Sequence, residues 1–189
     1  GRLGKSSKED VMGFVRAADQ INVALDDLGE GATLTLSKLT NIFGDEQRLG
    51  TEQALLSVGS VINELSQNCS ASAPYIAEFA SRMGGVGAQA GMTVQDIMAF
   101  GAVLDTAEVN VESAATAVGQ VLTRMYRDPS KYAQAAGLDV QKFTTLLKQD
   151  ANQALILFLD TLHQAGGMDV LSPMFADMGE KGSRAITTL

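Results

Sequence analysis

The sequence predicts an all-α fold: a compact multi-helix bundle of about eight short helices, with no sheet. Apolar residues recur three and four positions apart along most of the 189 residues, which is the spacing of one helix face. Capping side chains and glycines interrupt this pattern at short intervals, so the helices should be short. Nowhere do four or more residues alternate convincingly between apolar and polar, as they would in a half-buried strand.

Three helices are expected in the first third of the chain. Residues 6–9 (Ser-Ser-Lys-Glu) offer a capping box, in which a hydroxyl and a carboxylate satisfy free amide donors, and an apolar stripe follows over residues 11–28. Residues 29–31 (Gly-Glu-Gly) should end this helix, because glycine accepts the left-handed conformation found there. A short helix is expected at 34–43, and a longer one at 51–65.

The middle of the chain carries the clearest helix signals. Pro74 should lie near the start of a helix, where its missing amide donor costs nothing. The glycine-rich segment 84–87 should then break or bend the chain. Residues 93–96 (Thr-Val-Gln-Asp) predict another capped start. Asn110 should cap the most regular helix, whose apolar stripe continues to Met125.

The last third is expected to hold shorter helices. Asp128 and Pro129 should start a brief helix that closes at Gly137, and two further helices are expected at 140–147 and 152–164. The pattern then loosens, and four apolar residues indicate one further turn or two: Val170, Leu171, Met174 and Phe175.

The chain is expected to form a single helical domain, residues 1–189, excised from a longer protein. A chain of this length should bury roughly 70% of its unfolded surface, and no composition shift marks a linker. It begins at Gly1 instead of methionine and stops at Leu189 without a terminating signal. No apolar run approaches the ~20 residues of a membrane span. The first residues also lack the apolar segment of a signal peptide.

Charge and composition argue against several classes of function. Fourteen Lys and Arg against 22 Asp and Glu leave a net charge of −8, which opposes nucleic-acid binding and docking on anionic membranes. The single cysteine, Cys69, and the single histidine, His163, allow no internal disulfide, no four-thiolate zinc site and no two-histidine metal site. No cofactor or metal is expected.

No constellation of residues points to catalysis, so the chain is not expected to be an enzyme. The paired charges are typical of solvated or capping positions: they are Asp26 with Asp27, Asp45 with Glu46, and Glu78 with Arg82. Cys69 and His163 lack a third residue to orient them, so a packed cysteine and a helix-end histidine are the simpler interpretation. The segment 84–91 has no Gly-Lys-Ser/Thr and follows a helix, which favours a hinge or a close helix–helix approach over a phosphate loop.

Two features leave a binding role open. Arg124, Arg127 and Lys131 form a small basic cluster around Tyr126, which fits either a partner-docking patch or simple complementarity to a helix dipole. Several methionines supply either an adaptable binding surface or, as the better interpretation, ordinary core filling: they are Met12, Met92, Met98, Met125, Met168, Met174 and Met178. Neither feature identifies partner-binding residues.

Several short segments form a characteristic set of sequence motifs: 80–86 (Ala-Ser-Arg-Met-Gly-Gly-Val), 90–97 (Ala-Gly-Met-Thr-Val-Gln-Asp-Ile), 102–105 (Ala-Val-Leu-Asp), 111–117 (Val-Glu-Ser-Ala-Ala-Thr-Ala) and 121–125 (Val-Leu-Thr-Arg-Met). Together they resemble the core region of phage tail tape measure proteins of the TP901 type. That family continues with a proline-led segment, a glycine-led helix start and a late glycine–arginine segment, which here are 129–131, 137–140 and 182–184. The resemblance is good over 76–189, and holds only in general character for the helices before it, 1–75.

The resemblance implies a structural domain of a phage or prophage tail tape measure protein. Such a domain would act in tail assembly and tail-length determination through protein–protein contacts. The implied partners are the tail tube protein, tail assembly chaperones and tail tip proteins, and a homo-oligomer in the tail is compatible with them. The implied location is the virion tail, preceded by the host cytoplasm before assembly. Proteins of this family occupy the tail tube and leave it when DNA is ejected.

Two other functions remain open from the residues alone. A peptidoglycan-hydrolase module would need a cleft acid with a raised pKa, for which Glu64 and Glu78 are the candidates. An acidic helical adaptor or chaperone would need exposed apolar grooves. The shape is a further question, because one straight helix of this length would reach roughly 280 Å. The glycine breaks and caps instead favour a compact globule, with a radius of gyration of about 16 Å.

Overall fold

Eleven α-helices and one 3-10 helix make up the regular structure of the computed structural model, which describes residues 7–29, 31–164, 175 and 179–189. No strand occurs in these residues, so the all-α prediction is confirmed. The expected count of about eight helices is too low. In chain order the elements are α1 (Lys8–Ala24), η1 (Asp26–Leu28), α2 (Ala32–Ile42), α3 (Asp45–Leu49), α4 (Thr51–Asn68), α5 (Ala73–Gln89), α6 (Val94–Thr106), α7 (Val111–Arg127), α8 (Pro129–Ala135), α9 (Val140–Gln149), α10 (Ala151–Gln164) and α12 (Gly179–Thr188).

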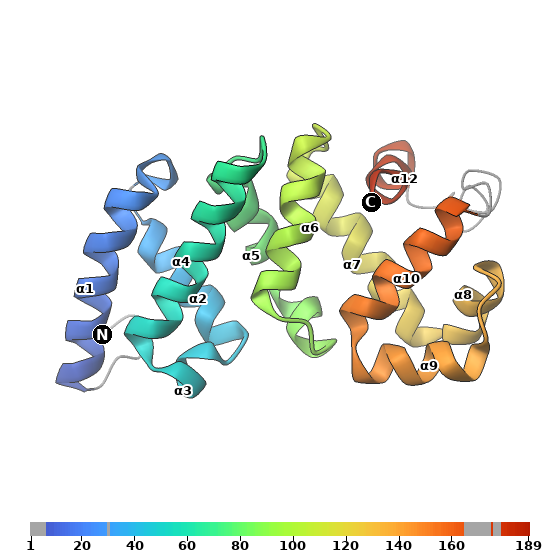
Figure 1. The fold of residues 1–189 in the computed structure, drawn as a ribbon, viewed down its shortest axis with the longest axis horizontal. Helices are drawn as coiled ribbons and strands as arrows, with labels where there is room; N and C mark the ends of the chain where they lie inside the picture. The colour runs from blue at the N-terminus through green and yellow to red at the C-terminus, as the bar shows by residue number, and fades with distance from the viewer. Residues whose placement is uncertain (1–6, 30, 165–174, 176–178) are drawn as a thin grey trace.

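The helices stand side by side in a row along the long axis of the molecule (Figure 1). α1 forms one end of the row, and α8, α9 and α10 form the other. α5 lies in the middle and packs against α2, α6 and α7, while α12 returns to pack against α7. One hydrophobic cluster runs through the row, from Ala17 of α1 to Ile186 of α12. Most packing therefore joins helices that are near neighbours along the chain.

Local capping chemistry starts most of the helices where the sequence predicts. The side chains of Thr93, Asn110 and Asp139 each accept hydrogen bonds from free amides in the first turn of α6, α7 and α9. The start of α1 differs slightly from the prediction, because its cap is Ser7, which accepts from the Asp10 amide. Ser6 lies outside the described residues. These caps place the helix starts to within about one residue.

The expected break at residues 84–87 is wrong, because α5 runs through it without interruption to Gln89. A Cβ atom at Gly87 would lie only 2.8 Å from Cδ1 of Ile97 on α6. Gly84 similarly faces Ile42, with 3.4 Å to its Cγ2 atom. The glycines therefore let neighbouring helices approach α5 closely, and this packing offsets their helix cost of about 1 kcal/mol each. The alternative interpretation, a close helix–helix approach, is confirmed.

Three elements of the structure differ from the prediction. The apolar stripe assigned to one helix over 11–28 is divided between α1 and η1. α3 has only five residues, too few for an apolar period, and lies between Gly44 and Gly50, whose φ angles are 76° and 79°. α12 has few apolar residues, so no stripe marks it. Phe175 is helical and buried, whereas Val170, Leu171 and Met174 lie outside the described residues.

The Asp96 carboxylate should contribute measurably to stability, since it serves two helices. One of its oxygens accepts from the Thr93 amide (2.9 Å) and the other from Nδ2 of Asn152 on α10 (3.0 Å). We expect Asp96→Ala to lower the free energy of unfolding by about 1–2 kcal/mol, measured by urea denaturation. Asn152→Ala removes the interhelical bond alone and should cost less. Equal stability of Asp96→Ala and the wild type would contradict the capping argument.

Candidate interaction surface

A groove with a volume of about 560 Å³ lies between α5 and α7. We call it the α5–α7 groove and define it by the residues that line it: Arg82, Met83 and Val86 of α5, and Ala115, Thr116, Gly119, Gln120, Thr123, Arg124 and Arg127 of α7. Besides its arginines, the groove is lined by small or apolar residues and by the polar side chains of Thr116, Gln120 and Thr123. Small residues on α7 leave the space, since a Cβ at Gly119 would meet only the Met83 sulfur, at 3.5 Å.

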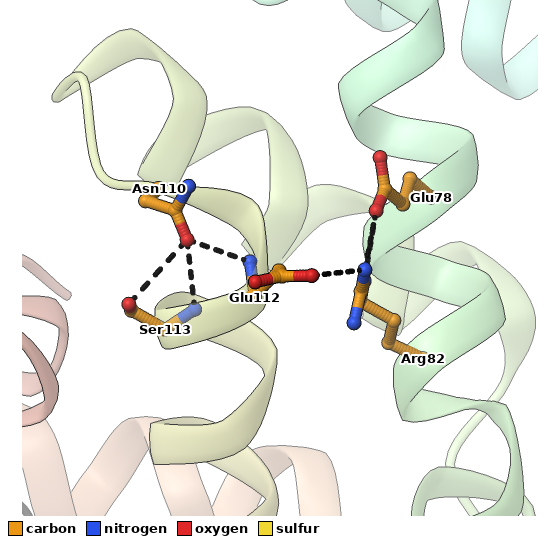
Figure 2. A network of polar contacts seen from close by, with 5 residues as sticks. All are labelled: Glu78, Arg82, Asn110, Glu112 and Ser113. Atoms are coloured by element: carbon orange, nitrogen blue, oxygen red, sulfur yellow. Dashed lines mark hydrogen bonds and ion pairs between the residues drawn. The ribbon is translucent and has the colours of Figure 1, made fainter.

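An ion-pair network closes one end of the groove (Figure 2). The Arg82 guanidinium donates to Glu78 on its own helix (2.7 Å) and to Glu112 on α7 (2.8 Å). Glu112 lies in the first turn of α7, where the Asn110 side chain accepts from the amides of Glu112 and Ser113. The helix cap thus positions the carboxylate that joins α7 to α5. The hydrogen bond to Glu78 is the main reason that the pKa of Arg82 is raised.

The Tyr126 hydroxyl joins three helices at the other end of the groove. It lies 2.8 Å from the carbonyl oxygen of Leu147 on α9 and 3.1 Å from that of Ala90, which follows α5. Burial raises the pKa of this hydroxyl, so it keeps the proton that these contacts need. The sequence placed Tyr126 inside a basic cluster. The structure gives it a role in holding α5, α7 and α9 together.

Two of the three predicted basic residues, Arg124 and Arg127, line this second end of the groove, and Lys131 of α8 does not. The Arg127 side chain is exposed. Within the described ranges, its guanidinium group forms no hydrogen bond and no ion pair. At the opposite end Glu78 and Glu112 more than balance the charge of Arg82. The groove is therefore positive at the C-terminal end of α7 and slightly negative at the N-terminal end.

The other candidate residues from the sequence do not come together. Cys69 is half-buried at the end of α4, where its thiol donates to the Leu65 carbonyl (2.7 Å). His163 is exposed in the last turn of α10, as predicted. The C-terminal ends of these two helices lie well apart in Figure 1. Glu64 and Glu78 are exposed on the surfaces of α4 and α5. Among the described residues, no three His, Cys, Asp or Glu side chains are grouped to hold a metal ion.

The pair Asp45 and Glu46 lies in the first turn of α3, one of the positions expected for it, but neither carboxylate is fully solvated. Asp45 is buried and accepts from Arg48 (2.6 Å). Glu46 is half-buried and accepts from the hydroxyl groups of Ser37 and Thr40, both of which are fully buried. These carboxylates hold α3 against α2, because a buried hydroxyl needs a hydrogen-bond partner. No pattern in the sequence marks this role, since the contacts depend on how α3 packs.

Most of the methionines in the described residues fill the core, which confirms the core-filling interpretation for them. Met92, Met98 and Met125 are buried. Met12 is different, because it is exposed on α1. Met168, Met174 and Met178 lie outside the described residues. No helix in the described part of the chain has both the length and the apolar character to cross a membrane.

Tyr75 should make stability fall at high pH. Its hydroxyl donates to the Val109 carbonyl (2.6 Å), and burial, followed by the charges of Asp105 and Glu78, raises its pKa to about 12. The unfolded chain releases this proton near pH 10. The folded state therefore loses relative stability as the pH rises from about 10 to about 12. Urea denaturation across this range should show a smaller decline for Tyr75→Phe than for the wild type. Parallel curves would contradict the assignment, and Tyr126→Phe is the control for the second tyrosine with a raised pKa.

A family model described as phage-related minor tail protein matches residues 2–187, which includes both walls of the α5–α7 groove. No curated protein and no solved structure matches the chain.

Proposed function

The chain belongs to the family of phage-related minor tail proteins, and within that family we propose that it is a structural domain of a tail tape measure protein. It would act in tail assembly and tail-length determination through protein–protein contacts, without catalysing a reaction. Its partners would be the tail tube protein, the tail assembly chaperones and the tail tip proteins. It would occupy the host cytoplasm before assembly and the virion tail afterwards.

The observation that carries this proposal is the family match over residues 2–187, nearly the whole chain. The motifs that resemble tape measure proteins, at 80–125, add support. They fall on α5, α6 and α7, the helices at the middle of the row. Their residues serve packing and capping: Gly84 faces a neighbouring helix, and Thr93 and Asp96 form a capping box. A motif made of such residues preserves a shape, which suits a role in assembly.

An in-frame deletion of residues 2–187 from the tail protein of the intact phage tests the proposal, with tails examined by electron microscopy. If the segment serves as an extended helical ruler, tails should shorten by roughly 280 Å, at 1.5 Å for each residue. If it acts as a folded assembly domain, tails should be absent. Tails of normal number and length would contradict the proposal.

A replacement variant separates the two roles. The deleted segment is replaced by an unrelated straight helical sequence of equal length. Because a ruler depends on length alone, the replacement should restore normal tails under the ruler mechanism. It should leave tails absent if the folded surface of α5, α6 and α7 makes the necessary contacts.

A further inference from the structure

α1 carries an outer face that no other helix of the described residues covers. Val11, Met12 and Val15 are about half exposed, at 48%, 46% and 55%, and their spacing places them on one side of the helix. α1 stands at the end of the row, so this side faces away from the rest of the molecule (Figure 1). A terminal helix of a stacked array normally has a polar outer face, which makes this apolar patch unusual.

Charge is distributed unevenly along the same face of α1. Lys8 lies at its N-terminal end and Asp19 in its C-terminal half, and both are exposed. Asp26 and Asp27 follow directly in η1 and are also exposed. The outer face of α1 thus runs from a cation, over an apolar patch, to the carboxylate of Asp19, and two further exposed carboxylates follow in η1. We call this set of residues (Lys8, Val11, Met12, Val15, Asp19, Asp26 and Asp27) the α1 face.

We propose that the α5–α7 groove of one molecule binds the α1 face of a second copy of this chain. The charges are complementary at both ends when α1 lies parallel to α7. Lys8 then meets the end of the groove where Glu78 and Glu112 leave a negative excess. The carboxylates meet the end formed by Arg124 and Arg127. Such complementary charges fix both the partner and its direction.

The two surfaces also match in length and shape. Glu112 and Thr123 on α7 are eleven positions apart, and so are Lys8 and Asp19 of the α1 face; each span is about 16 Å of helix. With Lys8 level with Glu112, Val15 lies level with Gly119, where the groove has no side chain. Val11 lies level with Ala115 in the same way. Apolar side chains of α1 would therefore enter the part of the groove lined by small residues.

Association through these surfaces is head to tail. The α1 face and the groove are different parts of the molecule, so a bound pair still offers one free groove and one free α1 face. Such heterologous contacts give open chains or closed rings instead of a simple symmetric dimer. The association needs no other tail protein, so the test of self-association does not depend on the proposed tape measure role.

Sedimentation velocity of the 189-residue chain tests the proposal. Between roughly 1 and 200 µM the average mass should rise with concentration. The rise should be weaker in high salt, because salt screens the charges at both ends of the groove. A chain that stays monomeric over this range would overturn the proposal.

Charge reversal identifies the surfaces. Arg127→Glu and Asp19→Lys should each weaken self-association by about tenfold or more, because each places like charges together. An equimolar mixture of the two variants should associate as the wild type does. In the mixture, the introduced carboxylate of the first variant meets the introduced ammonium group of the second, and the other contact is the native pair. Failure of the mixture to associate, or association that neither reversal changes, would overturn the proposal.

Two further variants serve as controls. Lys142→Glu makes the same charge change at an exposed residue of α9 that belongs to neither surface, and should leave self-association unchanged. Thr116→Trp introduces a large side chain at an exposed position of the groove and should block binding without altering the core. Circular dichroism confirms that each variant is folded. Equal weakening by Lys142→Glu would show a general charge effect and overturn the placement in the groove.

Discussion

Replacing Phe79 with alanine should lower the free energy of unfolding by about 3–5 kcal/mol, the range for loss of a buried aromatic side chain. Phe79 is fully buried on α5, the helix that packs against α2, α6 and α7. Its ring lies so close to α6 that a Cβ at Gly101 would be 3.0 Å from its Cδ1 atom. Because helices cover α5 on several sides, the space left by the ring cannot close easily.

Urea denaturation followed by circular dichroism measures this loss, and a second variant calibrates it. Val103→Ala shortens an apolar side chain on α6 that is half exposed, so it should change stability by no more than about 0.5 kcal/mol. A loss below about 1 kcal/mol for Phe79→Ala would mean that the middle of the row repacks freely. That result would contradict the close packing of α5 and α6.

Gly101→Ala should destabilise the protein by about 1–3 kcal/mol, although alanine is normally the better helix residue. In a helix interior this substitution alone should gain about 1 kcal/mol. Here the new methyl group would meet the Cδ1 atom of Phe79 at 3.0 Å and its Cβ and Cγ atoms at 3.2 Å. Because the Phe79 ring is fully buried, it cannot move out into solvent, so overpacking should outweigh the gain in helix propensity.

Gly85→Ala is the matched control for this prediction. Gly85 also lies inside a helix, α5, but it is exposed and nothing lies within 4 Å of an added Cβ atom. The same substitution should therefore raise the free energy of unfolding by about 0.5–1 kcal/mol. The two glycines should thus give changes of opposite sign. Stabilisation by both substitutions would show that α6 can move away from α5 at little cost.

Helix starts could be predicted from the sequence because the chemistry that sets them is local. Thr93, Asn110 and Asp139 each bond an amide two or three positions ahead, so the interaction is visible in the order of residues. The regular stripe of α7 was equally visible, and its predicted apolar residues are buried from Ala114 to Met125. Short elements without a stripe, such as α3, carry no such signal.

The groove could not be predicted, because the contacts that close it join distant parts of the chain. Arg82 meets Glu112 across 30 positions, and Tyr126 meets Ala90 across 36. The sequence identified Arg124 and Arg127 as a cluster but not the wall of α5 opposite them. The role of the glycines in segment 84–87 could not be predicted for the same reason. A glycine can allow the chain to bend or allow another helix to approach, and the sequence alone does not distinguish these two roles.

The row of helices has a mechanical consequence. Since α1 packs on α2 and α4, and α12 packs on α7, a force applied to the two ends of the chain would first detach α1 and α12. Contacts between neighbouring helices would then open one after another. The resistance of the fold to mechanical unfolding is therefore divided into several small steps, instead of one large step in which all contacts break together. The turns at Gly44, Gly50, Gly91 and Gly137 mark where each step would stop. Such a domain can be drawn out, helix by helix, through an opening much narrower than its folded width.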